Sequence, residues 1–189
     1  MAIKILFITL SNIGDVILTL PSLDSLRQAH PGAEITVISG PRPAEIFQNH
    51  PLIKNFILYD KHSSLKEKIK LFWKLKNMHF DLVVDLRNTF YGAFLPAKQR
   101  VSGIGRVPDS ARHMREKHLY KLQKINEGYR RLQEVTGNSI NIKPDDQEYI
   151  KKILNQNGIK KEDRIVIVSA GARSSTKRWP KENFLQLIP

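Results

Sequence analysis

Residues 4–21 read KILFITLSNIGDVILTLP, and this stretch decides the fold. Ile5–Leu10 is a short, mostly apolar run rich in strand-forming side chains, as expected of a buried parallel strand. Ser11–Gly14 interrupts this run with polar residues and glycine, and an apolar pattern of helical spacing follows over Val16–Leu20. The stretch therefore predicts a strand, a tight polar turn and a helix, which together form the first half of a β-α-β unit.

Asp15 is the first candidate functional residue, because it follows the polar turn that leaves the predicted strand and lies in the first turn of the predicted helix. In open α/β sheets, ligands bind outside the carboxyl ends of the strands, so Asp15 is expected at the mouth of a site. Gly14 before it lets a ligand or another backbone approach closely. Acidic residues also gather at helix N-termini to satisfy backbone N–H groups, and on the isolated motif such capping is the more frequent role.

Composition limits the class of protein. The chain has 189 residues and no cysteine, which excludes a disulfide framework, a thiolate nucleophile and a thiolate metal site, and favours a reducing cytoplasmic location. The N-terminus has no signal-peptide pattern, and no run approaches the roughly 20 apolar residues that span a bilayer. The formal net charge of +13 favours anionic partners: nucleic acid, an anionic membrane, or phosphorylated and carboxylated substrates.

The remaining strands and helices of the first part alternate along the chain. Further strands are predicted at 34–39, 55–59, 80–86 and, at an edge, 100–104. Helices are predicted at 22–29, 44–48, 63–78, 90–96 and 117–135. Pro21 must either kink the first helix or open a second short one. This alternation predicts an α/β fold with a Rossmann-like, doubly wound parallel sheet.

A second domain is predicted to begin near residue 141, so that residues 1–140 and 141–189 are separate. Gly137–Asp145 has the composition of a linker. A helix to about residue 155 follows, with Asp145 or Asp146 as its cap, and then a buried strand over Arg164–Ser169. A polar turn over 170–178 leads to a helix that opens at Trp179–Pro180.

Two separated blocks resemble one known family. The first block, Ser11–Pro21, has a small residue, then Gly-Asp, two apolar residues, one variable residue and the pair Leu-Pro. The second block, Ile165–Pro180, has a strand pattern followed by Gly-Ala and then by Lys-Arg-Trp-Pro. In this order and at this separation, with Phe80–Asn88 as an Asp-rich strand between them, they resemble glycosyltransferase family 9. These are the bacterial heptosyltransferases of lipopolysaccharide assembly.

The resemblance implies an inverting glycosyltransferase that moves a heptose-like sugar from an ADP-sugar donor to a lipopolysaccharide core acceptor. It implies the GT-B arrangement of two Rossmann-like domains with the active site between them. This chain would then hold the N-terminal, acceptor-side half and a truncated nucleotide-sugar-binding domain. Asp15 matches the proposed general base. No metal cofactor is expected, since the chain has no Asp-x-Asp pair and no His/Cys cluster of metal-ligand spacing.

The resemblance also assigns binding residues. Lys177 matches a lysine taken to contact the donor, with Thr176 and Ser175 in the loop near its phosphates. From the residues themselves, a loop that opens a helix binds phosphate through backbone N–H groups, although a plain basic surface loop explains this block equally well. On the acceptor side, an arginine presents a planar fork that suits carboxylate and phosphate. The acceptor-side candidates are Asn12, Gly14, Arg106, Arg112, His113 and Arg115.

Two other functions compete with the enzyme. A non-catalytic module that binds an acidic glycolipid would show affinity for the acceptor without turnover. A nucleic-acid-binding domain is suggested by charge alone, and the sequence has no RNP-like, zinc-finger or helix-turn-helix pattern to support it. A dehydrogenase is disfavoured because neither strand-turn block carries G-x-G-x-x-G. The basic surface favours peripheral contact with the anionic cytoplasmic face of the inner membrane.

Overall fold

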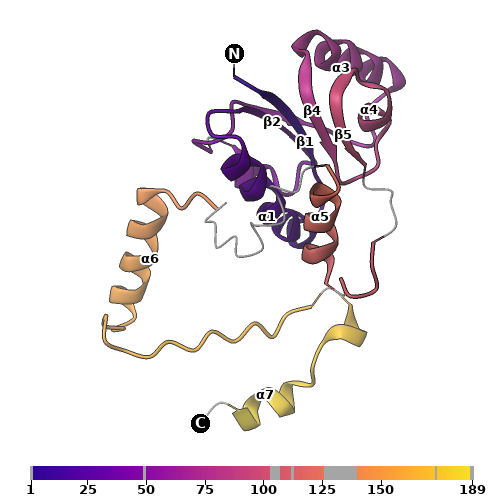
Figure 1. Ribbon diagram of the computed structural model, residues 1–189. Coiled ribbons are helices and arrows are strands. Elements are labelled where there is room, and N and C mark those ends of the chain that lie inside the picture. The colour runs from indigo at the N-terminus through magenta and orange to yellow at the C-terminus, as the bar shows by residue number, and fades with distance from the viewer. Residues whose placement is uncertain are drawn as a thin grey trace. The chain divides into compact units, whose positions relative to one another are not determined.

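The computed structural model describes residues 2–48, 50–102, 107–111, 113–125, 140–172 and 174–187. It divides into two compact units, Met1–Asn141 and Ile142–Pro189 (Figure 1). The first unit contains all the strands that the structure describes, and the second contributes two α-helices and a short 3-10 turn. Among the described helices, none combines the length and the apolar character needed to cross a membrane.

The first unit is built on a sheet of five parallel strands in the order β3-β2-β1-β4-β5. The strands are β1 (Lys4–Ile8), β2 (Glu34–Ser39), β3 (Asn55–Leu58), β4 (Phe80–Asp85) and β5 (Ala97–Ser102). The chain moves outward from β1 to β3 on one side, then crosses back and moves outward through β4 and β5 on the other. The predicted Rossmann-like, doubly wound parallel sheet is thus confirmed, with β1 at its centre.

Helices cover both faces of this sheet (Figure 1). Ile5 and Phe7 of β1 belong to the core beneath α1 (Ile13–Ala29) and α5 (Met114–Gln123). Leu6 and Ile8 point to the opposite face and pack with residues of α3 (Leu65–Met78) and α4 (Phe90–Phe94). All four side chains are fully buried, and each contributes roughly 2 kcal/mol to folding. Burial on both faces explains why β1 is apolar without alternation.

Helix α1 runs unbroken through Pro21, which decides between the two possibilities that the sequence left open. Pro21 has no N–H, and a proline inside a helix costs about 3 kcal/mol. Buried contacts over Ser22–Leu26 offset this cost. Buried hydroxyls also join the helix to the sheet: Thr19 donates to the Val16 carbonyl at 2.7 Å and accepts from Thr9 of the β1 end at 2.7 Å.

Several boundaries differ from the prediction in the first unit. Helix α3 begins at Leu65 because Ser64 caps it, with the Glu67 carboxylate accepting from the Ser64 N–H at 2.8 Å. Strand β5 begins at residue 97, before the predicted start, and its predicted end at 103–104 lies outside the described residues. Helix α5 begins at Met114, also earlier than predicted, and residues 126–139 lie outside the described part of the chain. A short α2 (Ala44–Phe47) follows β2 as predicted.

In the second unit, α6 (Pro144–Gln156) is capped two or three residues earlier than predicted. Its N-cap is Lys143, and Pro144 occupies the first helical position, where a missing N–H costs nothing. The predicted caps were therefore wrong, and Asp146 instead accepts a hydrogen bond from the Lys143 N–H at 3.1 Å. The unit continues with the 3-10 turn η2 (Ser175–Lys177) and α7 (Lys181–Leu187).

The predicted buried strand at Arg164–Ser169 is wrong. The segment forms no strand, and Val166 and Ile167 are 85% and 88% exposed. An apolar run becomes a strand only when a neighbour accepts and donates its ladder hydrogen bonds. No strand is present in the described residues of the second unit to provide them.

Gly92 and Asp85 lock the loop that leaves β4. The buried Asp85 carboxylate accepts from the N–H groups of Arg87 at 2.9 Å and Thr89 at 2.5 Å, and from the Thr89 hydroxyl at 2.9 Å. A Cβ on Gly92 would lie 2.1 Å from Asp85 Oδ2 and 2.4 Å from its Cβ. Only glycine therefore lets α4 pack against this carboxylate.

We predict that Gly92→Ala destabilises the chain by about 1–3 kcal/mol, because the added Cβ would displace a buried carboxylate that three hydrogen bonds hold in place. Gly14→Ala is the matched control: a Cβ there meets nothing within 4 Å, and alanine in a helix stabilises by about 0.5–1 kcal/mol. Urea denaturation followed by circular dichroism measures both. Equal stability of the two variants would contradict the packing described above.

Candidate functional site

The candidate site lies at the carboxyl edge of the sheet. Because the strands are parallel, the loops after β1, β2 and β4 all leave from this edge. β1 and β4 are neighbours, yet β1 leads to α1 on one face and β4 leads to α4 on the other. In doubly wound sheets, such a divergence is the switch point at which ligands commonly bind, in a crevice between the two loops.

Asp15 lies in the first turn of α1, on the β1 side of this switch point, and its side chain is exposed. The Asn12 amide donates to Asp15 Oδ2 at 2.9 Å, and Arg42 of the neighbouring β2–α2 loop donates to the Asn12 Oδ1 at 3.4 Å. Asn12 is the N-cap residue but makes no side-chain cap hydrogen bond. The polar side chains at this turn are therefore arranged toward the Asp15 carboxylate rather than toward the helix end.

The two glycines near Asp15 have different surroundings. A Cβ on Gly14 would meet nothing within 4 Å, so this side of the turn is open to an approaching molecule. A Cβ on Gly40, after β2, would lie 3.0 Å from the Ser11 Cβ. Ser39 also donates to the Leu10 carbonyl at 3.2 Å. The β1–α1 turn is therefore held tightly against β2 on one side and open on the other.

His118 of α5 is a residue that sequence reasoning missed. It is 2% exposed, and neither ring nitrogen has a hydrogen-bond partner within the described chain. The pKa of His118 is lowered to about 4, first by burial and then by the positive charge of Lys121, whereas the negative charge of Asp15 acts in the opposite direction. A neutral imidazole therefore lies close enough to Asp15 to sense its charge. Nothing in the sequence around His118, a single histidine in a lysine-rich helix, indicates that it is buried near Asp15.

The predicted acceptor residues of the basic stretch are only partly described. His113 caps α5: its Nδ1 accepts from the Arg115 N–H at 3.3 Å, and its own N–H donates to the Glu116 carboxylate at 3.2 Å. His113 and Arg115 line one hollow of about 810 Å³, most of whose α5 residues lie on the opposite side of the helix from His118. Arg106 and Arg112 lie outside the described residues.

The predicted donor residues lie together in the second unit. Ser175, Thr176 and Lys177 form the 3-10 turn η2, and all three are exposed. The Thr176 hydroxyl is 2.7 Å from that of Ser174, and Arg178 Nε donates to the Ala172 carbonyl at 2.7 Å. The turn thus presents hydroxyl groups and a lysine on one short segment, a set suited to phosphate oxygens.

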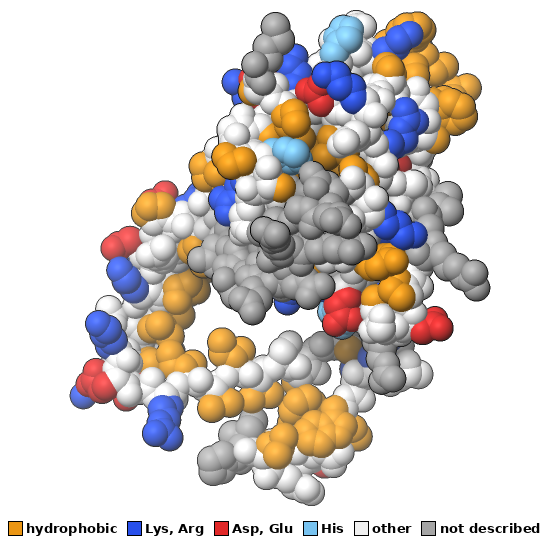
Figure 2. Space-filling view, viewed as in Figure 1, with side chains coloured by type: hydrophobic (Ala, Val, Ile, Leu, Met, Phe, Trp, Pro, Cys, Tyr) orange, Lys and Arg blue, Asp and Glu red, His pale blue; other side chains and the backbone are white. Residues whose placement is uncertain are grey.

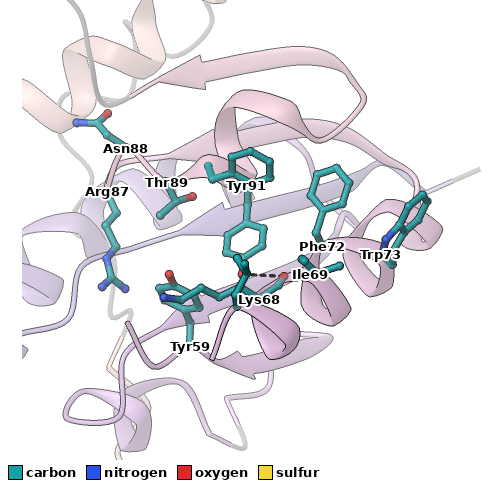
Figure 3. Close-up of a pocket in the computed structure, with 11 residues that line it drawn as sticks. Tyr59, Lys68, Ile69, Phe72, Trp73, Arg87, Asn88, Thr89 and Tyr91 are labelled. Carbon is teal, nitrogen blue, oxygen red and sulfur yellow. Dashed lines mark hydrogen bonds between the residues drawn. The ribbon is translucent and has the colours of Figure 1, made fainter. Parts of the chain in front are cut away.

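A pocket of about 680 Å³ opens beside the β4–α4 loop (Figure 3). Arg87 lies at one end of it with its guanidinium 4.9 Å from the Tyr59 ring centre, and Trp73 lies at the other end. The Tyr91 hydroxyl donates to the Lys68 carbonyl at 3.2 Å, and burial raises the pKa of Tyr91 to about 12. The pocket is lined mainly by apolar and aromatic side chains: Tyr59, Leu65, Lys68, Ile69, Phe72, Trp73, Arg87, Asn88, Thr89, Phe90 and Tyr91.

The sequence profile of the family described as "Glycosyltransferase family 9 (heptosyltransferase)" matches residues 68–189, more than half of the chain. The chain belongs to glycosyltransferase family 9. This confirms the resemblance drawn from its two sequence blocks. Among the curated relatives of the family 9 chain is lipopolysaccharide heptosyltransferase 3 of Escherichia coli (strain K12), 25% identical over 200 residues. That match covers 93% of this chain and 56% of the relative.

Solved structures share the fold of the family 9 chain. A glycosyl transferase family 9 protein from Veillonella parvula DSM 2008 matches with a TM-score of 0.77 at 20% identity, over 97% of this chain and 58% of the other. E. coli ADP-heptose lps heptosyltransferase II gives a TM-score of 0.67 at 20% identity, over 98% and 60%. E. coli heptosyltransferase WaaC with ADP gives 0.61 at 18% identity, over 98% and 63%. The family 9 chain thus spans between 56% and 63% of these relatives' lengths.

The buried His118 predicts an acid-sensitive stability for this family 9 chain. Unfolded, a histidine takes up its proton near pH 6.5, but in the folded chain the pKa of His118 is about 4. Between these values the unfolded state binds more protons, so stability is full above pH 6.5 and falls as the pH drops toward 4. The loss from pH 7.5 to pH 5 should be about 2 kcal/mol.

His118→Leu should remove this loss, because leucine fills the site without a group to protonate. The exposed His62 provides the matched control, His62→Leu, which should keep the wild-type pH dependence. Urea denaturation at pH 7.5 and pH 5 measures all three proteins. If His118→Leu loses as much stability on acidification as the wild type, a buried neutral His118 is excluded.

Proposed function

We propose that this chain forms the acceptor side of an inverting heptosyltransferase of GT-B arrangement. The reaction transfers a heptose-like sugar from an ADP-sugar donor to a lipopolysaccharide core acceptor. Family membership supports the transferase class, and the substrates come from the relatives' names: a curated relative is a lipopolysaccharide heptosyltransferase, and a solved relative carries ADP.

The observation that carries the proposal is the exposed Asp15 carboxylate at the switch point between β1 and β4, oriented by Asn12 at 2.9 Å. A carboxylate in this position can accept the proton of an acceptor hydroxyl within hydrogen-bond reach. The freed oxygen attacks the anomeric carbon of the donor sugar as the bond to the diphosphate breaks. Attack from the face opposite the departing ADP inverts the configuration at that carbon.

On the donor side, Lys177 places a positive charge to offset the charge that develops on the departing diphosphate. Ser175 and Thr176 add hydroxyl donors from the same turn. We further propose that the reaction proceeds without a bound metal, because Lys177 and these hydroxyls supply the stabilisation that a metal ion gives elsewhere. Asp15 and Lys177 belong to different units of the chain, as expected of a GT-B enzyme.

On the acceptor side, Asn12 and Gly14 flank the base, and Arg115 and His113 line a hollow that suits a phosphate or carboxylate. Arg106 and Arg112 are proposed to extend this surface. A net charge of +13 attracts an acidic acceptor and an anionic membrane surface. Because the proposed acceptor is anchored in the inner membrane, we propose that the enzyme acts at the cytoplasmic face of that membrane.

We predict that Asp15→Asn lowers sugar transfer by about 10²–10⁴-fold, since an amide cannot take the acceptor proton. Affinity for the acceptor should remain, because the amide keeps the shape of the carboxylate and its contact with Asn12. Transfer is measured as ADP release from ADP-heptose with a lipopolysaccharide-core acceptor, and affinity by calorimetry. Asp145→Asn removes another exposed carboxylate from the first turn of a helix and should leave both values unchanged.

The outcomes separate the candidate functions. Release of ADP that needs the acceptor and is lost in Asp15→Asn supports both the enzyme and the base. Undiminished transfer by Asp15→Asn would remove the base assignment while leaving the transferase. Binding of the acceptor by the wild type without any release of ADP would favour the glycolipid-binding module.

A further inference from the structure

Helix α3 carries two apolar faces, and only one of them is used by the core. Leu75 is buried, and Leu71 and Met78 pack beside it against the sheet. A second row, Leu65, Ile69 and Trp73, recurs every four residues and points outward: these side chains are 74%, 50% and 53% exposed. A helix that only covers a sheet needs one apolar face, so the outward row requires another explanation.

Helix α4 extends this outward row into a patch. Phe90 and Phe94 are both exposed, and their rings stack at 4.4 Å. The Phe72 ring lies 5.6 Å from Phe90 and 6.0 Å from Trp73, which joins the two helices. Exposed apolar side chains lie over α3 and α4 in Figure 2. We call these side chains the aromatic patch: Leu65, Ile69, Trp73, Phe90 and Phe94.

Lysines line the aromatic patch. Lys66, Lys70 and Lys74 follow one another along α3, next to the outward row by helical geometry, and all three are exposed. Lys76 lies with its Nζ 4.7 Å from the Trp73 ring centre. The sole acid of α3, Glu67, is occupied in the capping box with Ser64. Neither salt bridge found within the described chain involves a lysine of α3.

We propose that the aromatic patch and the α3 lysines form a docking surface for an anionic lipid bilayer. A lysine row beside an outward row of Leu, Ile and aromatic side chains is the pattern of a helix that lies in the membrane interface. The aromatic rings enter the boundary between headgroups and acyl chains, and the lysines contact the anionic headgroups. Unlike an apolar protein partner, a bilayer matches both the apolar row and the unopposed positive charge.

The surface also borders the candidate site, and its purpose rests on the proposed function. Leu65, Ile69, Trp73 and Phe90 line the same pocket as the loop Arg87–Thr89, which leaves the carboxyl edge of the sheet. Docking through α3 and α4 therefore brings that edge toward the lipid surface. An acceptor that is itself anchored in the bilayer would meet the crevice beside β4 without leaving the membrane.

Trp73 reports directly on docking. In a Trp179→Phe background it is the only tryptophan of the chain. Vesicles of phosphatidylglycerol and phosphatidylcholine should shift its emission to the blue, and brominated acyl chains should quench it. Vesicles of phosphatidylcholine alone should do neither at the same protein concentration. Unchanged Trp73 emission with the anionic vesicles, or an equal response to both kinds, would overturn the proposal.

Variants then test which residues bind the vesicles. Lys66→Gln with Lys70→Gln and Lys74→Gln should weaken vesicle binding at least tenfold, because each lysine near an anionic surface adds to the attraction. Lys151→Gln with Lys152→Gln and Lys160→Gln removes the same charge from exposed positions of the second unit and should leave binding within twofold, about the noise of such an assay. Equal loss in both triple variants would show attraction by net charge alone and overturn the docking surface.

A further pair of measurements covers the remaining outcomes. Ile69→Ser with Phe94→Ser removes two exposed side chains, so folding should persist by circular dichroism while vesicle binding falls. If light scattering shows a dimer that these substitutions dissociate, a second copy of the chain covers the patch and the proposal is overturned. Asp15→Asn should bind vesicles like the wild type. Vesicle binding therefore tests the docking surface independently of the sugar-transfer activity that tests the proposed function.

Discussion

The burial of β1 on both faces is the constraint on which the rest of the first unit depends. With Ile5, Leu6, Phe7 and Ile8 all fully buried, helices must cover each side of the sheet, and the next strands must add on either side of β1. The chain therefore has to diverge after β1 and β4, which creates the switch point between them. Asp15 is placed at that switch point by the position of its strand, and its orientation then follows from local contacts with Asn12.

The sequence was most informative where structure depends on local pattern. Apolar runs bounded by turn residues located the sheet strands to within a few residues, and Gly14–Asp15 marked the open turn after β1. The sequence pattern failed to predict features that depend on contacts between residues far apart in the chain. A proline stays within α1 because the surrounding helix is buried, and His118 meets the charge of Asp15 because α5 packs on α1. Neither fact has a signature in neighbouring residues.

The segment Arg164–Ser169 shows that a strong local strand pattern is not sufficient to form a strand. Its apolar pattern is as strong as that of β1, yet the structure gives it no ladder and leaves Val166 and Ile167 exposed. β1 differs in having β2 and β4 as hydrogen-bonded neighbours. Strand propensity measures how well side chains fit a pleated, half-buried surface, so it acts only when that surface exists.

Net charge and apolar exposure say different things about a surface, and α3 shows why both are needed. A charge of +13 spread over the chain attracts any anion and selects no face. The outward row of α3 selects a face, but alone it would suit any apolar partner. Their coincidence on one helix is specific, because few partners offer an apolar interior directly beneath a layer of negative charge. A lipid bilayer has that order of layers, and the α3 side chains follow it.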